Sequence, residues 1–471
     1  MKRLLPLLIP LGGGFFFMSS AHAADGQTNV VCAYNHTLGD DAIMMYGKPN
    51  EAMWHDFFGN TSTDAFSTYD SLRAHVSTTC DNKADSSAYW APSMRLPDGQ
   101  ILKPSYQKTY YQANQVQKYP LTPFPKGLEL LAGDHHGTAP NPHITFLCGN
   151  GNGYTNKADQ VCGLRAAGDA VQFNIGIEFP NCWDGVNLKP ARGKMNATYS
   201  VNDACPANFP VKIPTVNMNV AYVLTQLTSL DTSTVQLSMD PVMEGNKRIE
   251  RWGSLYTAHA DFINGWTEQG AEFMTKYCMN EARACGKTVP YSFNIASENT
   301  YVSSETPDKN VGDTKELQVS DDWRKPGRNE NPQSLAMLKF KIPPMPTNLT
   351  QEEMKAFQYQ LRIYGQNATD NAIILSFAYA LDKNWSEQTA TWKNHAPAST
   401  TAVTSLLMDN GRYWRDFNVD NYVRQAIAES KDEISIYLGG ERNARLITFE
   451  GKDGAHPPML VLTALQTTPE P

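Results

Sequence analysis

The distribution of cysteine is the feature that most constrains how this chain can fold. All eight cysteines lie between residues 32 and 285, at positions 32, 80, 148, 162, 182, 205, 278 and 285. An even number in an exported protein predicts disulfide bonds, here up to four, and no pair has the CxxC or HxxxH spacing of a zinc site. Short separations favour local bridges between Cys182 and Cys205 and between Cys278 and Cys285. The absence of cysteine after them predicts a domain boundary near Gly286.

The first 23 residues have the pattern of a secretory signal peptide. Lys2 and Arg3 precede an apolar stretch over residues 4–18, and Ala21-His22-Ala23 is the small-x-small pattern that signal peptidase cuts. We therefore expect residues 1–23 to be removed and the rest to be secreted, either to the extracellular space or to a periplasm. No later stretch reaches the roughly 18 consecutive apolar residues of a membrane span, so none is predicted.

The charge balance argues against nucleic acid as a partner. Without Lys2 and Arg3, 38 basic residues face 48 acidic ones, which gives a net charge of −10. A surface of this sign repels the phosphate backbone on which binding to nucleic acid depends.

The length of 471 residues and the strand patterns predict a mostly β chain with two tandem domains. The first, residues 24–286, has short apolar runs between turn signals, with strands at 171–179 and 215–227 and one short helix at 268–284. The second, residues 287–466, has period-two strands at 336–342, 359–364, 372–379, 433–438 and 459–465, which indicate an antiparallel β-sandwich that folds by itself. Residues 467–471 form a tail.

The tract at 179–185, Phe-Pro-Asn-Cys-Trp-Asp-Gly, is the first candidate site. Trp183 offers an apolar face to a sugar ring, Asp184 can accept hydrogen bonds from hydroxyl groups, and Glu178 precedes them at the end of a strand. The alternative is a structural turn in which Trp183 packs on the Cys182 disulfide.

Two other tracts place histidine near carboxylates. His55 lies in Trp-His-Asp-Phe-Phe-Gly-Asn (54–60), followed by Tyr89 and Trp90 as a possible stacking platform. His259 and Asp261 are two residues apart, so in a strand they share one face, and Trp266 follows them. The alternative for His55 is a buried ring with a backbone partner.

A loop at 132–143 holds further histidines. His135, His136 and His143 lie there with Asp134, and exposed loop histidines are usually solvated rather than metal-bound. We find no G-x-S-x-G, HExxH or phosphate-binding glycine loop, and we predict no metal and no cofactor.

The first domain resembles a family of secreted proteins known as domain of unknown function 1996. The matching blocks, in order, are 54–60, Tyr-Trp-x-Pro at 89–92, Tyr-Tyr at 110–111, Phe-Pro-Lys-Gly-Leu at 124–128 with Ala-Gly at 132–133, 179–185, Cys-Pro at 205–206 with Ile-Pro at 213–214, and 259–266. The family usually carries histidines followed by Tyr-Pro before Cys205, whereas this chain reads Lys-Met-Asn-Ala-Thr-Tyr-Ser at 194–200. Any role of those histidines in relatives is therefore absent here.

The second domain is similar to the DNRLRE-type module, which is also grouped as carbohydrate-binding module family 96. Trp-Ser-Glu-Gln-Thr-Ala-Thr-Trp at 385–392 is the most specific match, with Asn-Thr-Tyr-Val at 299–302, Asn-Val-Gly at 310–312, Leu-Lys-Phe at 338–340, Phe-Glu at 449–450 and Pro-Pro-Met-Leu at 457–460. The resemblance implies a jelly-roll-like sandwich that binds sugar. At least one of Trp385 and Trp392 is expected to be a core residue.

Together these features predict a secreted bacterial protein that recognises an extracellular or cell-wall polysaccharide, and whose first domain either cleaves it or only binds it. An enzyme of this kind would be a polysaccharide-active glycoside hydrolase or lyase. Its catalytic candidates are Asp184, His55, His259, Asp261 and Glu178, and its substrate-binding candidates are Trp183, Tyr89, Trp90 and Trp266. The alternative is a surface or matrix protein whose two domains bind glycans or give structural support.

Overall fold

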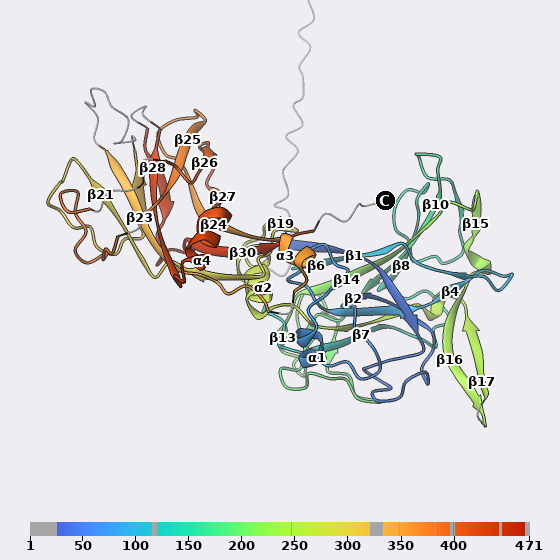
Figure 1. The fold of residues 1–471 in the computed structure, drawn as a ribbon. Coiled ribbons are helices and arrows are strands. Elements are labelled where there is room, and N and C mark those ends of the chain that lie inside the picture. The colour runs from blue at the N-terminus through green and yellow to red at the C-terminus, as the bar shows by residue number, and fades with distance from the viewer. Residues whose placement is uncertain are drawn as a thin grey trace, which may run out of the picture.

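The computed structural model describes residues 26–114, 120–245, 247–320, 333–347, 349–381, 383–395, 399, 401–441 and 445–466. The predicted signal peptide and the predicted tail lie outside these residues. Strands dominate both halves of the described chain, which confirms the prediction of a mostly β protein (Figure 1). In this part of the chain, no helix combines the length and the apolar character needed to cross a membrane.

A large sheet forms the centre of the N-terminal half. The predicted strands at 171–179 and 215–227 are confirmed as β10 and β14, which pair antiparallel and bury most of their β-branched and aromatic side chains. The strands, in the order in which they pair, are β7 (Glu129–Gly133), β18 (His259–Ile263), β3 (Ala88–Pro92), β2 (His55–Gly59), β1 (Gln27–Leu38), β6 (Tyr106–Gln112), β14 (Thr215–Leu224), β10 (Val171–Glu178) and β8 (Ile144–Cys148), with β19 (Ala284–Gly286) beside β1.

Smaller elements surround this sheet. Three short sheets consist of β12 (Ala197–Thr198), β11 (Cys182–Trp183) and β13 (Val211–Lys212); of β15 (Ser229–Asp231) and β9 (Val161–Gly163); and of β17 (Lys247–Gly253), β16 (Gln236–Glu244), β4 (Met94–Arg95) and β5 (Ile101–Leu102). The helical turns are α1 (Tyr69–Ala74), η1 (Thr232–Thr234) and η2 (Leu255–Thr257).

The predicted helix at 268–284 is shorter than its sequence pattern indicates. It consists of α2 (Glu268–Phe273), capped by the Thr267 side chain, and a π-helical continuation, η3 (Met274–Met279). Ala282 then has a positive φ of 51°, and the chain enters β19. The Cys278–Cys285 disulfide and the pairing of β19 with β1 therefore replace the last helical turn.

The C-terminal half forms two antiparallel sheets packed face to face, as predicted. The first sheet contains β20 (Ser292–Ile295), β30 (Met459–Ala464), β24 (Phe357–Asn367), β29 (Ile447–Glu450) and β22 (Glu316–Val319), with β27 (Tyr413–Asn418) beside β24. The second contains β21 (Glu298–Ser303), β23 (Ser334–Lys341), β28 (Glu433–Gly440), β25 (Ile374–Ala380) and β26 (Thr404–Met408). Two short helices, α3 (Gln351–Lys355) and α4 (Asp420–Ala428), complete this half. Alternating side chains of both sheets fill the space between them, including Leu338 and Leu361, which have no exposed surface.

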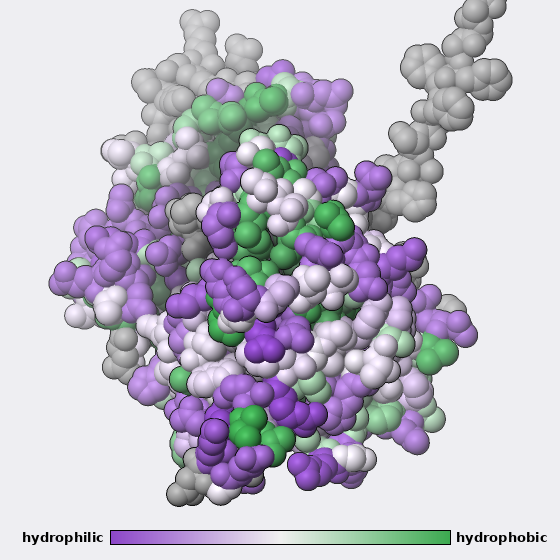
Figure 2. Space-filling model, turned by 90° about the vertical axis from the view of Figure 1, so that its right-hand side faces the viewer, coloured by the Kyte–Doolittle hydropathy of each residue, from purple (hydrophilic) through white to green (hydrophobic). Residues whose placement is uncertain are grey.

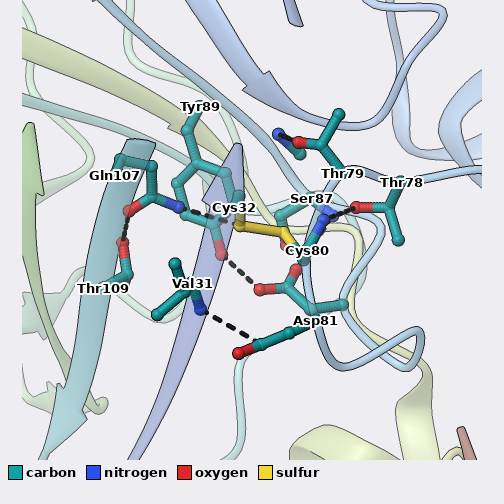
Figure 3. The surroundings of a disulfide bond; sticks show 12 residues. Val31, Cys32, Thr78, Thr79, Cys80, Asp81, Ser87, Tyr89, Gln107 and Thr109 are labelled. Atoms are coloured by element: carbon teal, nitrogen blue, oxygen red, sulfur yellow. Dashed lines mark hydrogen bonds between the residues drawn. A yellow bond between two sulfur atoms is a disulfide. The ribbon is translucent and has the colours of Figure 1, made fainter. Parts of the chain in front are cut away.

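All eight cysteines lie in the described residues and form disulfides. The two predicted local bridges, Cys182–Cys205 and Cys278–Cys285, are confirmed, and Cys148–Cys162 is a third local bridge. The fourth, Cys32–Cys80, joins β1 to a segment 48 residues later and is fully buried (Figure 3). Its surroundings are polar, because Gln107 donates a hydrogen bond to the Cys32 sulfur and Asp81 accepts one from the Val31 backbone N–H.

The two halves contact each other through apolar rings and backbone hydrogen bonds. The ring of Phe273 on α2 lies 6.0 Å from that of Phe293 on β20 and 6.5 Å from that of Trp414 on β27. The Lys83 backbone N–H donates to the Ala464 carbonyl over 2.7 Å. One continuous apolar cluster therefore includes buried residues of both halves.

The outer face of the N-terminal half mixes polar and apolar residues. In Figure 2, which views the molecule from the right-hand side of Figure 1, hydrophilic residues surround smaller groups of apolar ones. Apolar residues scattered over a surface in this way are normal for a folded protein in water.

Candidate functional site

A pocket of about 690 Å³ opens in the N-terminal half at one end of β3. β2 and β18 both pair antiparallel with β3, so their first residues, His55 and His259, arrive at the same end of the sheet. Loops that follow β1, β7 and β11 form further walls, together with residues of β12 and β16. The lining comprises Asp41, Met44, Met45, Met53, His55, Leu131, Ala132, Gly133, Asp134, His135, His136, Pro180, Ala191, Arg192, Gly193, Met195, Ala197, Thr198, Tyr199, Asp240, His259, Ala260 and Asp261.

His55 is buried at the bottom of this pocket, with 1% of its surface exposed. Its Nδ1 lies 2.9 Å from the backbone carbonyl of Asp40, which can only accept, so Nδ1 carries the proton. Nε2 then presents a lone pair, and it has no hydrogen-bond partner among the described residues. Burial lowers the pKa of His55 to about 4, so the ring is neutral at pH 7.

His259 is arranged in the same way. Its Nδ1 donates to the Thr257 carbonyl over 2.9 Å, and its ring centroid lies 5.9 Å from that of His55. Burial and the neighbouring His55 lower its pKa to about 4. His259 is half-buried whereas His55 is buried, and both residues line the pocket.

Asp261 shares the face of His259 and has 3% of its surface exposed. Its carboxylate makes no hydrogen bond with any residue that the structure describes, and burial together with Asp41 and Asp240 raises its pKa well above the usual range. One donor atom from each of His55, His259 and Asp261 lies within 4.8 Å of the others. The structure therefore brings three of the five predicted catalytic residues into one cluster.

Two carboxylates beside this cluster were not predicted from the sequence. Asp41, in the loop after β1, accepts hydrogen bonds from the backbone N–H groups of Ile43 and Met44 over 2.8 and 3.0 Å. Burial raises the pKa of Asp41 above its usual value. Asp240 reaches the same pocket from β16. Neither residue belongs to a motif, and only the sheet order brings them to His55.

The loop at 191–199 also lines the pocket, and no motif identified its role. Arg192, Met195 and Tyr199 contribute to the wall, and the Tyr199 hydroxyl donates to the Glu178 carbonyl over 2.8 Å. This is the stretch where the sequence departs from the pattern described above, with no histidine between 185 and 205. The departure therefore changes a wall of the pocket and leaves the His55, His259 and Asp261 cluster intact.

Two of the loop histidines lie at the pocket, and the third lies beside Glu178. His135 and His136 line the pocket, and the His135 ring lies 5.9 Å from the His259 ring. His143 lies elsewhere, with Nδ1 3.0 Å from the Glu178 carboxylate and its ring stacked on Tyr199. Glu178 is thus paired with His143 and does not join the catalytic candidates around His55.

Three of the aromatic residues predicted to bind sugar are core residues. Tyr89 and Trp90 have no exposed surface and Trp266 has 1%, so none presents a face to a ligand. Tyr89 bonds instead to the buried Asp85 and to Tyr111. Tyr89 and Trp90 lie on β3, which pairs with β2 and β18, but their side chains and that of Trp266 pack inside the two apolar clusters.

Asp184 and Trp183 form a turn outside the lining of the pocket. One Asp184 carboxylate oxygen accepts from the backbone N–H groups of Val186 and Asn187 over 2.9 and 2.8 Å, and the other accepts from the Asn187 amide. The Trp183 indole N–H donates to the Asn187 carbonyl over 2.7 Å. Partial burial alone would raise the pKa of Asp184, but these hydrogen bonds outweigh it and lower the pKa.

We expect Asp184→Ala to lower the free energy of unfolding by about 1–3 kcal/mol, because the turn loses its acceptor. Thermal unfolding measures the change, with Asp159→Ala as the control, an exposed aspartate. Unchanged stability combined with lost glycan binding would instead assign Asp184 to the functional site.

A second hollow of about 460 Å³ lies on the outer face of the large sheet. Alternate residues of β6 point into it, and they are joined by amide side chains of β10 and β14. The lining comprises Tyr106, Lys108, Tyr110, Gln112, Thr145, Tyr154, Asn174, Asn217 and Asn219. Flat phenol rings beside amide donors and acceptors are suited to the faces and hydroxyl groups of sugars.

Comparison with known families gives two adjacent matches. Residues 41–266 match the family described as domain of unknown function (DUF1996), and residues 290–464 match carbohydrate-binding module family 96. No curated protein matches the chain. The first match contains His55, His259 and Asp261, and the second covers the two antiparallel sheets of the C-terminal half.

Proposed function

Because the chain consists of a DUF1996 domain followed by a carbohydrate-binding module family 96 domain, we propose that it is a secreted protein that binds a polysaccharide through the second domain and cleaves it in the pocket of the first. The carbohydrate-binding module supports a glycan as the ligand. Four disulfides persist best in an oxidising compartment outside the cytosol, and their presence supports secretion.

The pocket at the end of β3 is the observation that carries the catalytic part. It combines two neutral imidazoles, fixed by backbone carbonyls, with the carboxyl groups of Asp41, Asp240 and Asp261. Buried groups with displaced pKa values in a concave site are typical of catalysis. The volume of about 690 Å³ lies within the range of small-ligand sites, which is about 300–1,000 Å³.

The charges of the lining favour a neutral polysaccharide. Asp134 and Asp240 outnumber the single guanidinium of Arg192, while the raised pKa values of Asp41 and Asp261 favour the neutral forms of those two carboxyl groups. A polyuronate would place its own carboxylates against this surplus of negative charge, which is unfavourable. We therefore favour hydrolysis, in which a proton passes to the glycosidic oxygen and the hydroxyl of water adds to the anomeric carbon.

Product detection with the mature chain, residues 24–471, tests this proposal. The chain is incubated with neutral and acidic polysaccharides, and new reducing ends are measured together with the ultraviolet absorption of the unsaturated product that a lyase would release. General acid–base groups typically contribute about 10²–10⁴-fold. We therefore expect His259→Ala to lower the rate at least about a hundredfold.

The matched control is His75→Ala, which removes an exposed histidine that does not line the pocket. Release of an unsaturated product would show that the chain cleaves by elimination and not by hydrolysis. Cleavage that is unchanged in His259→Ala would contradict the placement of the reaction in this pocket.

The second hollow supports the alternative of glycan binding without cleavage. Tyr106 and Tyr110 are four residues apart on β6, so their rings lie on one face of the sheet beside Tyr154. If the panel yields a bound polysaccharide but no product, and Tyr110→Ala weakens the binding, the N-terminal domain is a binding module. If a polysaccharide binds without being cleaved and Tyr110→Ala does not weaken the binding, the C-terminal domain is the binding module.

A further inference from the structure

We propose that His55, His259 and Asp261 bind one divalent transition-metal cation through the two Nε2 atoms and the Asp261 carboxylate, at the inner end of the pocket. This inference adds a metal ion to the proposed catalytic pocket. It rests on the proposed function only where it concerns the action of the cation on a glycan. The binding of the cation itself follows from the geometry of the three side chains.

The three donors lie nearly as close as one ion requires. Around a tetrahedral ion with bonds of about 2.0–2.1 Å, neighbouring ligand atoms are about 3.3 Å apart. One donor atom from each of the three residues lies within 4.8 Å of the others. Small rotations of the side chains therefore complete the site without any movement of β2 or β18.

The hydrogen bonds of both rings prepare Nε2 for a metal. His55 and His259 each donate Nδ1–H to a backbone carbonyl, of Asp40 and Thr257, over 2.9 Å. In metal sites the second ring nitrogen is usually tied in this way, which fixes the tautomer and the direction of the lone pair. Neither ring needs to change its hydrogen bonds to accept an ion.

Two buried polar groups at this site make no hydrogen bond within the described residues. The His55 Nε2 has no hydrogen-bond partner among the described residues, although only 1% of His55 is exposed. The Asp261 carboxylate is buried near the carboxyl groups of Asp41 and Asp240 and makes no hydrogen bond in the described chain. A divalent cation would satisfy the nitrogen and offset the repulsion between the carboxylates.

The donor set and the open side of the cluster indicate the kind of ion. Two imidazoles and one carboxylate suit Zn²⁺ and neighbouring transition metals rather than Ca²⁺ or Mg²⁺, which prefer oxygen ligands. Three protein ligands at the inner end of a pocket leave a position open toward the space that a glycan would enter. His135, whose ring lies 5.9 Å from that of His259, also lines the pocket.

Metal titration of the mature chain tests the inference without any sugar. The protein is stripped with a chelator and titrated in parallel with Zn²⁺, Mn²⁺, Fe²⁺ and Ca²⁺ by calorimetry, and bound metal is counted by elemental analysis. We expect one equivalent of a transition metal and no stoichiometric Ca²⁺. Titration with Co²⁺ should add visible absorption bands that report nitrogen and oxygen ligands.

Two conservative variants and one control identify the ligands. His259→Gln and Asp261→Asn approximately preserve the size of the side chain and each remove a direct ligand. Loss of a residue that only hydrogen-bonds a ligand typically lowers metal affinity about 10–100-fold, so we expect these variants to weaken metal binding at least about a hundredfold. His75→Ala should bind as the unaltered chain does. Circular dichroism and thermal unfolding establish that each variant is folded, and the Co²⁺ spectrum reads the site directly.

The result that overturns the inference is the absence of stoichiometric binding, or binding that survives both His259→Gln and Asp261→Asn in folded protein. The outcome is separable from that of the proposed function. Metal binding without any glycan product supports the site and contradicts cleavage, whereas cleavage that persists in protein shown to bind no metal contradicts only the site.

Discussion

Replacing Cys32 and Cys80 together by alanine is expected to lower the free energy of unfolding by about 4 kcal/mol. The bond closes a loop of 48 residues, and a cross-link of this length removes about that much chain entropy from the unfolded state. Both residues are completely buried, and Cys32 accepts a hydrogen bond from Gln107 (Figure 3). The loss therefore also leaves a small cavity and an amide without its partner.

Denaturant unfolding of the mature chain measures this change. The matched control is the Cys278→Ala, Cys285→Ala pair, whose bridge closes only 7 residues and should contribute about 2 kcal/mol. Equal losses for the two double variants would show that chain entropy does not govern the contribution of these bridges.

The second large effect is expected at the contact between the two halves. Phe273→Ala should lower the free energy of unfolding by about 3–5 kcal/mol, the usual range for deletion of a buried phenylalanine. Phe273 has 2% of its surface exposed, its ring contacts those of Phe293 and Trp414, and the Arg362 guanidinium lies 5.1 Å from its centroid. The substitution removes the apolar centre of this contact, so the halves should unfold in separate steps.

Calorimetry of the mature chain distinguishes one transition from two. The control is Phe66→Ala, because 53% of Phe66 is exposed and its loss should change stability by less than about 1 kcal/mol. A single transition that is unchanged in Phe273→Ala would show that the contact carries little energy. The independent folding of residues 287–466 stays a prediction, and the shared apolar cluster at Phe273 is the feature that opposes it.

The sequence by itself determined the local elements of this protein. Strands such as β10, β14, β23 and β28 lie where the predicted apolar runs stand, because alternation of side chains is a property of a few consecutive residues. The bridges at 182–205 and 278–285 were predictable for the same reason, since their cysteines are close along the chain. Sets of such local motifs also identified both families.

Only the tertiary structure decided which residues meet. The pairing of Cys32 with Cys80 follows from the antiparallel bridge between their segments, and no spacing rule predicts it. In the same way, His55 and His259 are about two hundred residues apart and meet because β2 and β18 both pair with β3. Asp41 and Asp240 join them from loop and strand positions that carry no motif.

The burial of individual side chains also could not be predicted from the sequence. Tyr89, Trp90 and Trp266 have the composition of a sugar-binding surface, but sheet packing turns them into the core. Asp184 looked like a ligand-binding carboxylate, yet one of its oxygens accepts hydrogen bonds from the backbone of its own turn and the other accepts one from the Asn187 side chain. A side chain's type defines what it can bind, whereas the arrangement of neighbouring strands defines whether it faces a pocket, the solvent or the interior.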